Sequence, residues 1–297
     1  MKRHSSLTHS QGNEGLLGFT DKVQISRDPM LLASLKKIKK VACGANHVLA
    51  LDANGSVFAW GAGEQNQLGR RIIERSKLQG LVPREFGLPR KAIQDIACGS
   101  YHSFAIDNKD RVFGWGLNNF GETGVTEGVG EDDAAILKPT VVEALSGKLV
   151  VSIAGGSHHS IAALGNGDCV TWGRIDGNQI GIPTDKLPED NIMKDAEGRI
   201  RIVTVPAKVD AIPDQVSYVT AGPEHNIAVT AGGKAYSWGF SANYQTAQGT
   251  EDDVLVPTLI DNAAVREKHL LKAFAGGQFG VLTCAADQKT NGVDGSA

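Results

Sequence analysis

Four copies of one short pattern constrain this chain more than any other feature of its sequence. Each copy has a glycine three residues before a histidine, and a Trp-Gly pair whose tryptophan lies 13 residues after that histidine. The histidines and their tryptophans are His47 and Trp60, His102 and Trp115, His159 and Trp172, and His225 and Trp238. These are all four tryptophans of the chain. A fifth, degenerate copy has Phe279 at the histidine position, so the sequence indicates a repeat protein.

The core of each copy has the pattern of a β-hairpin. In the first copy, the Asn-Gly pair at 54–55 suits a two-residue turn in which both residues have positive φ. Folding the chain about that turn places Leu51 opposite Phe58. Leu49 then lies opposite Trp60, and both faces of the hairpin are apolar, one bulky and one small. Such strands are typical of sheets covered on both sides, which favours propeller blades over an immunoglobulin-type sandwich or a helical solenoid.

Composition agrees with a folded repeat chain and narrows its partners. Glycine is high, at 36 of 297 residues, as a turn-rich repeat requires. The formal net charge of −3 argues against a protein built mainly to coat nucleic acid or an acidic membrane. No apolar run is long enough for a transmembrane helix, and no secretory signal is visible. Four cysteines without a Cys-x-x-Cys pair favour a reduced, intracellular protein.

The repeated histidines do not have the spacing of a metal site. They occur once per copy, and none has a cysteine or carboxylate at metal-ligand spacing. A P-loop, a Gly-x-Ser-x-Gly motif and a dinucleotide-binding glycine motif are also absent from the sequence. We therefore expect no metal, no cofactor and no catalytic residue that makes or breaks covalent bonds. Whether the chain acts as an enzyme stays open at this point.

The copies resemble the repeat of the regulator of chromosome condensation family. VACGANHVLAL, IACGSYHSFAI and AGGSHHSIAAL are similar to the first half of that repeat, and WGAGEQNQLG is similar to its second half. The resemblance covers about residues 13–285. GEQNQLGR, LNNFGETG, the His-His pair of GGSHHS, and SANYQ are also similar to a fungal form of the founding nuclear member, the nucleotide exchange factor of the Ran GTPase.

The resemblance implies an all-β fold of the seven-bladed β-propeller family. Because only about five copies are present, we expect an incomplete, open arc of blades over residues 13–285. The segment NEGLLGF at 13–19 resembles the end of the third blade, where the family has a β-wedge. We expect residues 1–12 to be disordered or mis-joined and residues 286–297 to be a disordered tail, as in a truncated gene product.

The resemblance also implies a function. It predicts a nuclear guanine-nucleotide exchange factor for a Ran-type small GTPase, which acts by binding at the propeller rim and by the wedge. Chromatin or histones are a further implied partner, although the basic tail with which the family contacts nucleosomes has no match here. No membrane partner is expected. The alternative is a propeller scaffold that binds protein partners without exchange activity.

Family positions at the GTPase interface can be carried over one residue at a time. They fall on Asn13, Glu14, Asp21, Asn46, Arg70, Asn119, His159, Arg174 and Asn243. At two positions the sequence departs from the family. Asn46 stands where the family has an acidic residue, and Phe279 stands where it has a histidine. Both departures favour the scaffold alternative.

Overall fold

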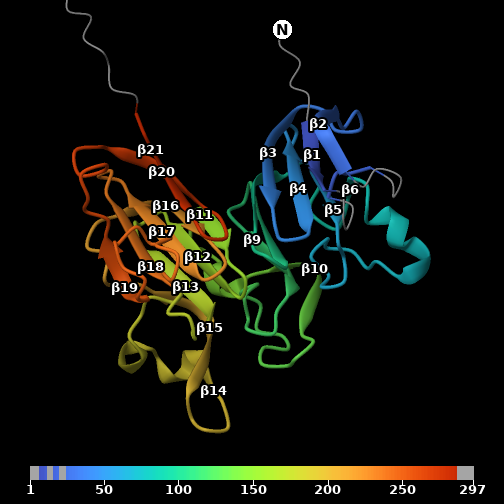
Figure 1. Ribbon diagram of the computed structural model, residues 1–297. Coiled ribbons are helices and arrows are strands. Elements are labelled where there is room, and N and C mark those ends of the chain that lie inside the picture. Colours follow the sequence, from blue (N-terminus) through green and yellow to red (C-terminus); the bar gives the residue numbers. More distant parts are fainter. Residues whose placement is uncertain (1–6, 12–15, 20–24, 286–297) are drawn as a thin grey trace, which may run out of the picture.

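Each copy of the repeat forms an antiparallel hairpin that grows into a small sheet, here called a blade (Figure 1). This computed structural model describes residues 7–11, 16–19 and 25–285. The blades follow one another in chain order, from blue through green to orange in Figure 1, and confirm the predicted β-propeller architecture. Within the described residues, no strand of the last sheet pairs with a strand of the first.

Four blades are complete, and the chain continues into half of a fifth. Blade 1 contains β3 (Ile38–Cys43), β4 (His47–Asp52), β5 (Val57–Gly61) and β6 (Arg84–Glu85). Blade 2 contains β7 (Ile93–Cys98), β8 (His102–Asp107), β9 (Val112–Leu117) and β10 (Ala135–Val141). Blade 3 contains β11 (Val150–Gly155), β12 (His159–Leu164), β13 (Cys169–Arg174), β14 (Ile192–Lys194) and β15 (Ile200–Lys208). Blade 4 contains β16 (Val216–Ala221), β17 (His225–Thr230), β18 (Ala235–Gly239) and β19 (Val254–Leu259), and the half-blade contains β20 (Leu270–Ala275) and β21 (Gly280–Cys284).

Segments outside the four-strand pattern of the blades also have regular structure. Strand β1 (Leu7–Gln11) pairs with β2 (Ile25–Leu31), so part of the segment 1–12 that was expected to be disordered is a strand. In the polar segment at 182–205, β14 pairs with β15. Short 3-10 helices lie at 74–79, 143–145, 184–186 and 189–191. None of the described helices is long and apolar enough to cross a membrane.

The hairpin loops have three residues rather than two, so the predicted register of the first hairpin is wrong by one. The main-chain N–H of Asp52 donates to the carbonyl of Ser56 at 3.0 Å, and Gly55 inside the loop has a φ of 84°. A three-residue loop that ends in a left-handed residue suits the twist of paired strands. The other three hairpins repeat this loop, with left-handed residues Asp110, Gly167 and Gly233.

The corrected register moves the side chains of the second strand of the first hairpin to the opposite face. Leu51 pairs with Val57, and Leu49 pairs with Ala59, so these four side chains share the face that packs against blade 2. The opposite face carries Trp60, which packs with the side chains Leu32, Leu35, Val48 and Ala50. Both faces are therefore buried and apolar, as a blade between two neighbours requires.

The histidine of each of the first three patterns connects its blade to the next one. Its Nε2 lies within hydrogen-bond distance of the side chain that follows the next histidine. The pairs are His47 with Ser103 at 2.8 Å, His102 with Ser160 at 2.8 Å, and His159 with Asn226 at 3.0 Å. The glycine three residues earlier is needed for space, because a Cβ on Gly99 would overlap the ring of His102.

The tryptophan of each pattern reaches back to the preceding blade. Its indole N–H donates to one loop carbonyl there. The donors and acceptors are Trp115 to Gln67 at 2.9 Å, Trp172 to Glu122 at 3.1 Å, and Trp238 to Gln179 at 3.0 Å. Trp60 donates in the same way to Leu16 at 3.0 Å. The order Leu16, Leu17, Gly18 matches Gln67, Leu68, Gly69, and both glycines have positive φ, so residues 16–18 occupy the place of a preceding blade's loop.

The junction between blade 4 and the half-blade lacks this hydrogen bonding. Gly280 follows Phe279, so no side chain reaches His225, whose buried Nε2 has no partner. Pro223 has no N–H, whereas Ser157 at the same loop position donates to the next blade's Pro223 carbonyl at 2.9 Å. What remains is apolar packing with two hydrogen bonds, from the Leu270 N–H to the Gly233 carbonyl at 2.9 Å and from the Ala275 N–H to the Thr220 hydroxyl at 3.3 Å. The half-blade is therefore attached to its neighbour more weakly than the complete blades are.

Restoring the missing hydroxyl is expected to stabilise the half-blade. In Gly280→Ser, the new Cβ meets the Cδ1 of Ile227, which is the movable end of a side chain, and lies 3.5 Å from the Gln245 carbonyl. The serine can then accept from His225 and donate to Gln245, as Ser103 does with His47 and Gln67. We expect a gain of about 1 kcal/mol in the free energy of opening, read by hydrogen exchange in β20 and β21. Gly280→Ala is the control, and equal protection in the two variants would contradict the prediction.

The buried histidines are expected to make the fold sensitive to acid. Burial lowers the pKa of His47 to about 3 and that of His159 to about 4, whereas an unfolded histidine takes up its proton near pH 6.5. Below pH 6.5 the unfolded chain therefore binds more protons, and the free energy of unfolding falls by up to about 1.4 kcal/mol per pH unit for each such histidine. Urea denaturation at pH 7.5, 6.0 and 5.0 measures this.

A matched variant isolates the contribution of one histidine to this acid sensitivity. Burial also lowers the pKa of His225 to about 4, and the next copy carries Phe279 at the same position. We expect the free energy of unfolding of His225→Phe to fall less between pH 7.5 and pH 5.0 than that of the wild type, by the contribution of one buried histidine. Equal stability of the wild type at pH 7.5 and pH 5.0 would contradict the explanation.

Candidate functional site

The loops between the third and fourth strands lie at one rim and share one turn. In three of the four loops, a glutamine accepts a hydrogen bond from the main-chain N–H two residues before it. The acceptors are the Oε1 atoms of Gln67 at 2.9 Å, Gln179 at 2.7 Å and Gln245 at 2.8 Å. In blade 2 the residue is Glu122, whose Oε2 accepts from the Phe120 N–H at 2.8 Å. The four loops therefore have the same turn, and only blade 2 has a carboxylate in place of the glutamine amide.

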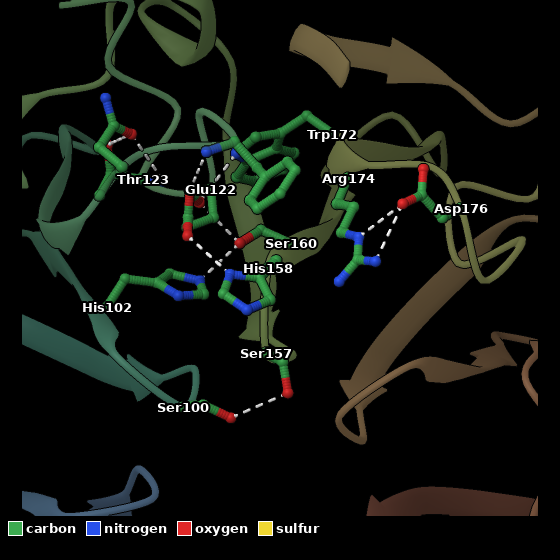
Figure 2. Close-up of polar contacts among 12 residues, drawn as sticks. Ser100, His102, Glu122, Thr123, Ser157, His158, Ser160, Trp172, Arg174 and Asp176 are labelled. Atoms are coloured by element: carbon green, nitrogen blue, oxygen red, sulfur yellow. Dashed lines mark hydrogen bonds and ion pairs between the residues drawn. The ribbon is translucent and has the colours of Figure 1, made fainter. Parts of the chain in front are cut away.

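The altered loop of blade 2 meets a histidine of blade 3 (Figure 2). The Nδ1 of His158 lies 3.3 Å from Oε1 of Glu122, and the glutamate side chain is fully buried. The imidazole ring lies 5.1 Å from the ring of Phe120 and 6.3 Å from that of Tyr101, measured between centroids. About a quarter of the His158 side chain is exposed. These contacts hold the ring in place while one edge faces solvent.

Arginines from blade 3 extend the cluster. The guanidinium of Arg174 lies over the ring of Phe120 at 5.3 Å, and it pairs with Asp176 at 2.9 Å (Figure 2). Arg201 pairs with the same carboxylate at 2.6 Å. Asn119 adds an amide whose buried Oδ1 has no hydrogen-bond partner. We call Asn119, Phe120, Glu122, His158, Arg174 and Asp176 the rim cluster.

The predicted site residues fall into three groups. Asn13, Glu14 and Asp21 lie outside the described residues. The second group lies at the rim: Asn119 and Arg174 lie together in the rim cluster, Asn46 lies in the loop between β3 and β4, and Asn243 lies in the loop between β18 and β19. Arg70 and His159 have structural contacts and form the third group.

Arg70 and His159 are engaged inside the fold. The guanidinium of Arg70 donates to the carbonyls of Ala59 at 3.1 Å and Gln79 at 3.2 Å, and burial lowers its pKa to about 10. His159 is fully buried and pairs with Asn226. The residue exposed at this corner is His158, because strand β12 begins at His159 and its first side chain points into the blade junction.

Four members of the rim cluster were missed in the sequence: Phe120, Glu122, His158 and Asp176. Glu122 and His158 show the reason. Glu122 could have been found by aligning the four loops, since it stands where the other three have glutamine. For His158, only the register of β12 decides which residue of the His-His pair faces outward. Neither residue belongs to the repeated pattern, which is why a search for that pattern passes over them.

The groups in the rim cluster are suited to recognition. Imidazole, guanidinium, carboxylate and amide side chains offer hydrogen-bond donors and acceptors to a protein surface. Among residues 7–11, 16–19 and 25–285, no three His, Cys, Asp or Glu side chains are grouped so that they could hold a metal ion. Burial raises the pKa of the Cys98 and Cys169 thiols, which keeps them unreactive.

Substituting the two neighbouring histidines should separate structure from recognition. His159→Ala removes a fully buried side chain and leaves Asn226 without its partner, so we expect a loss of about 2 kcal/mol or more in stability. His158→Ala removes a partly exposed side chain, and the space that it leaves admits water to the Oε1 of Glu122, so we expect a loss below about 1 kcal/mol. Thermal or urea denaturation of both variants is the measurement. A larger loss of stability in His158→Ala than in His159→Ala would show that His158, and not His159, is the buried side chain.

Known proteins share both the sequence and the fold. Residues 7–282 match the RCC1-like domain family. The chain is 44% identical over 271 residues to protein pim1 of Schizosaccharomyces pombe, and 43% identical over 273 residues to guanine nucleotide exchange factor SRM1 of Saccharomyces cerevisiae. These alignments cover 91% of this chain but only 49% and 56% of the two relatives, so the chain spans about half the length of the curated relatives it matches.

A solved structure agrees with this match. The crystal structure of Prp20p from Saccharomyces cerevisiae superimposes with a TM-score of 0.86 at 40% identity, over 96% of this chain and 65% of that one. A structure of human WBSCR16, at 17% identity and a TM-score of 0.59, shares the fold alone. The repeated histidine and tryptophan junctions, the blades they join and these likenesses lead to one assignment: the chain belongs to the RCC1-like domain family of β-propellers.

Proposed function

We propose that this chain is a guanine-nucleotide exchange factor for a Ran-type small GTPase. The observation that carries the proposal is the identity of more than 40%, across nine-tenths of the chain, to relatives that include a protein named as a guanine nucleotide exchange factor. The Prp20p structure was reported together with its binding to Gsp1p and histones, and a second structure has Kap60 bound to yeast RCC1. A GTPase is accordingly the first partner to test, and histones are the second.

The proposed mechanism needs binding and no bond-making chemistry. The rim cluster contacts the GTPase, and the wedge expected at residues 13–16 disturbs the nucleotide site. If the rim binds the nucleotide-free GTPase more tightly than the GDP-bound form, binding lowers the affinity for GDP by the same factor. The exchange factor itself then needs no cofactor. Action on Ran places the chain in the nucleus.

The proposed architecture is an open arc from a seven-bladed ring. Residues 16–18 take the place of a preceding blade's loop under Trp60, which supports a position after a third blade. At the half-blade, the apolar side chains Phe274, Phe279 and Val281 are about half exposed, which supports an uncovered blade face there. An arc of this kind leaves more apolar surface in water than a closed ring, and repeat arrays need capping ends.

Release of a fluorescent GDP from Gsp1p tests the proposed function. We expect the full chain to accelerate release, and we expect Asn119→Ala and Arg174→Ala each to lower the second-order rate constant about tenfold or more, as truncation at the centre of an interface does. Lys109→Ala is the control, because Lys109 lies exposed in a hairpin turn at the opposite end of the strands. Binding of Gsp1p without accelerated release would favour the scaffold alternative, and neither binding nor release would overturn the proposal.

A further inference from the structure

Glu122 differs from its three counterparts by a single atom at the end of its side chain. Glutamine and glutamate both provide the oxygen that accepts the turn N–H, as Gln67 and Glu122 do. Their remaining terminal atom is opposite in character. A glutamine presents an NH₂ group, which donates, whereas an ionised glutamate presents a second oxygen, which only accepts. The turn itself therefore gives no reason for the exchange.

The second oxygen faces one partner. Oε1 of Glu122 lies 3.3 Å from Nδ1 of His158, and the glutamate side chain is fully buried. A buried carboxylate is unfavourable unless hydrogen bonds satisfy it. Because the carboxylate only accepts, Nδ1 must carry the proton of this hydrogen bond. The arginine of the cluster does not compete, since Arg174 pairs with Asp176.

The orientation of the imidazole leaves its other nitrogen for a partner. Phe120 and Tyr101 contact the ring. Its Nδ1 points to Glu122 (Figure 2). Nε2 then lies on the part of the ring away from Glu122, in a side chain that is about a quarter exposed. With the proton of the neutral ring held on Nδ1, Nε2 is a hydrogen-bond acceptor.

We propose that Glu122 is a positioning residue of the GTPase interface, which holds the proton of His158 on Nδ1 so that Nε2 accepts a hydrogen bond from an N–H donor of the GTPase. A lysine, an arginine or a main-chain amide of the partner supplies this donor. The same loop carries the exposed acidic residues Glu131, Asp132 and Asp133, which suit a basic partner surface. This inference rests on the proposed function.

The test is Glu122→Gln, which gives blade 2 the residue of the other blades. The glutamine keeps the acceptor for the Phe120 N–H, so thermal stability should change little. Its NH₂ group donates to Nδ1 of His158, so the proton of the neutral ring moves to Nε2. Nε2 is then a donor that faces the donor of the partner, and the hydrogen bond between them is lost. In ¹H–¹⁵N spectra of the full chain at pH 7.5, we expect His158 to change from the Nδ1–H to the Nε2–H form.

GDP release by Gsp1p provides the second measurement. We expect Glu122→Gln to lower the second-order rate constant about tenfold, and to have no further effect in a His158→Ala background, because Glu122 acts through His158. An Nε2–H form of His158 in the wild type would overturn the inference. So would unchanged release by Glu122→Gln when Asn119→Ala and Arg174→Ala impair it. A wild-type chain that releases no GDP overturns the proposed function, and with it the role of Glu122 in exchange.

Discussion

Each complete blade junction depends on one hydrogen-bonded group that spans two blades. A histidine of one blade reaches a serine or asparagine of the next, and that side chain and a tryptophan both donate to one loop carbonyl of the first blade, as Ser103 and Trp115 do with Gln67. The 13-residue spacing follows from this group, because His47 pairs across the hairpin with Gly61, the residue after Trp60. Polar atoms in a dry interface must be paired, so the group fixes how consecutive blades meet.

The sequence predicts the blades but not the register inside them. Spacing and apolar pattern are enough to indicate hairpins, since both are set by the repeat. The register depends on whether a loop has two or three residues, and Asn54-Gly55 fits either a two-residue turn or the end of a three-residue loop with Gly55 left-handed. One residue of difference moves Phe58 and Trp60 to the other face, because side chains alternate along a strand.

The same one-residue ambiguity affects the candidate site. A family resemblance points to the His-His pair, and the start of strand β12 decides that His159 is buried and His158 faces the rim. Arg70 shows a second reason why site residues are hard to predict from sequence. Its charge suggests a binding residue, but in the fold its guanidinium donates hydrogen bonds to the carbonyls of Ala59 and Gln79. Asn119 and Arg174 were predicted and do lie in one cluster, because equivalent loops of a propeller meet at one rim.

Repetition explains why a recognition site can develop at one corner without loss of the fold. The turn at position 122 needs one acceptor oxygen, and the junction needs only the main-chain carbonyl of that residue, which Ser160 and Trp172 reach at 2.8 and 3.1 Å. The second terminal atom of the side chain is therefore free to differ between blades. In the proposed interface, stability and recognition use separate atoms of Glu122 and separate members of the His158-His159 pair. A substitution at His159 would then weaken binding by loosening a blade junction, whereas one at His158 would act at the proposed binding surface itself.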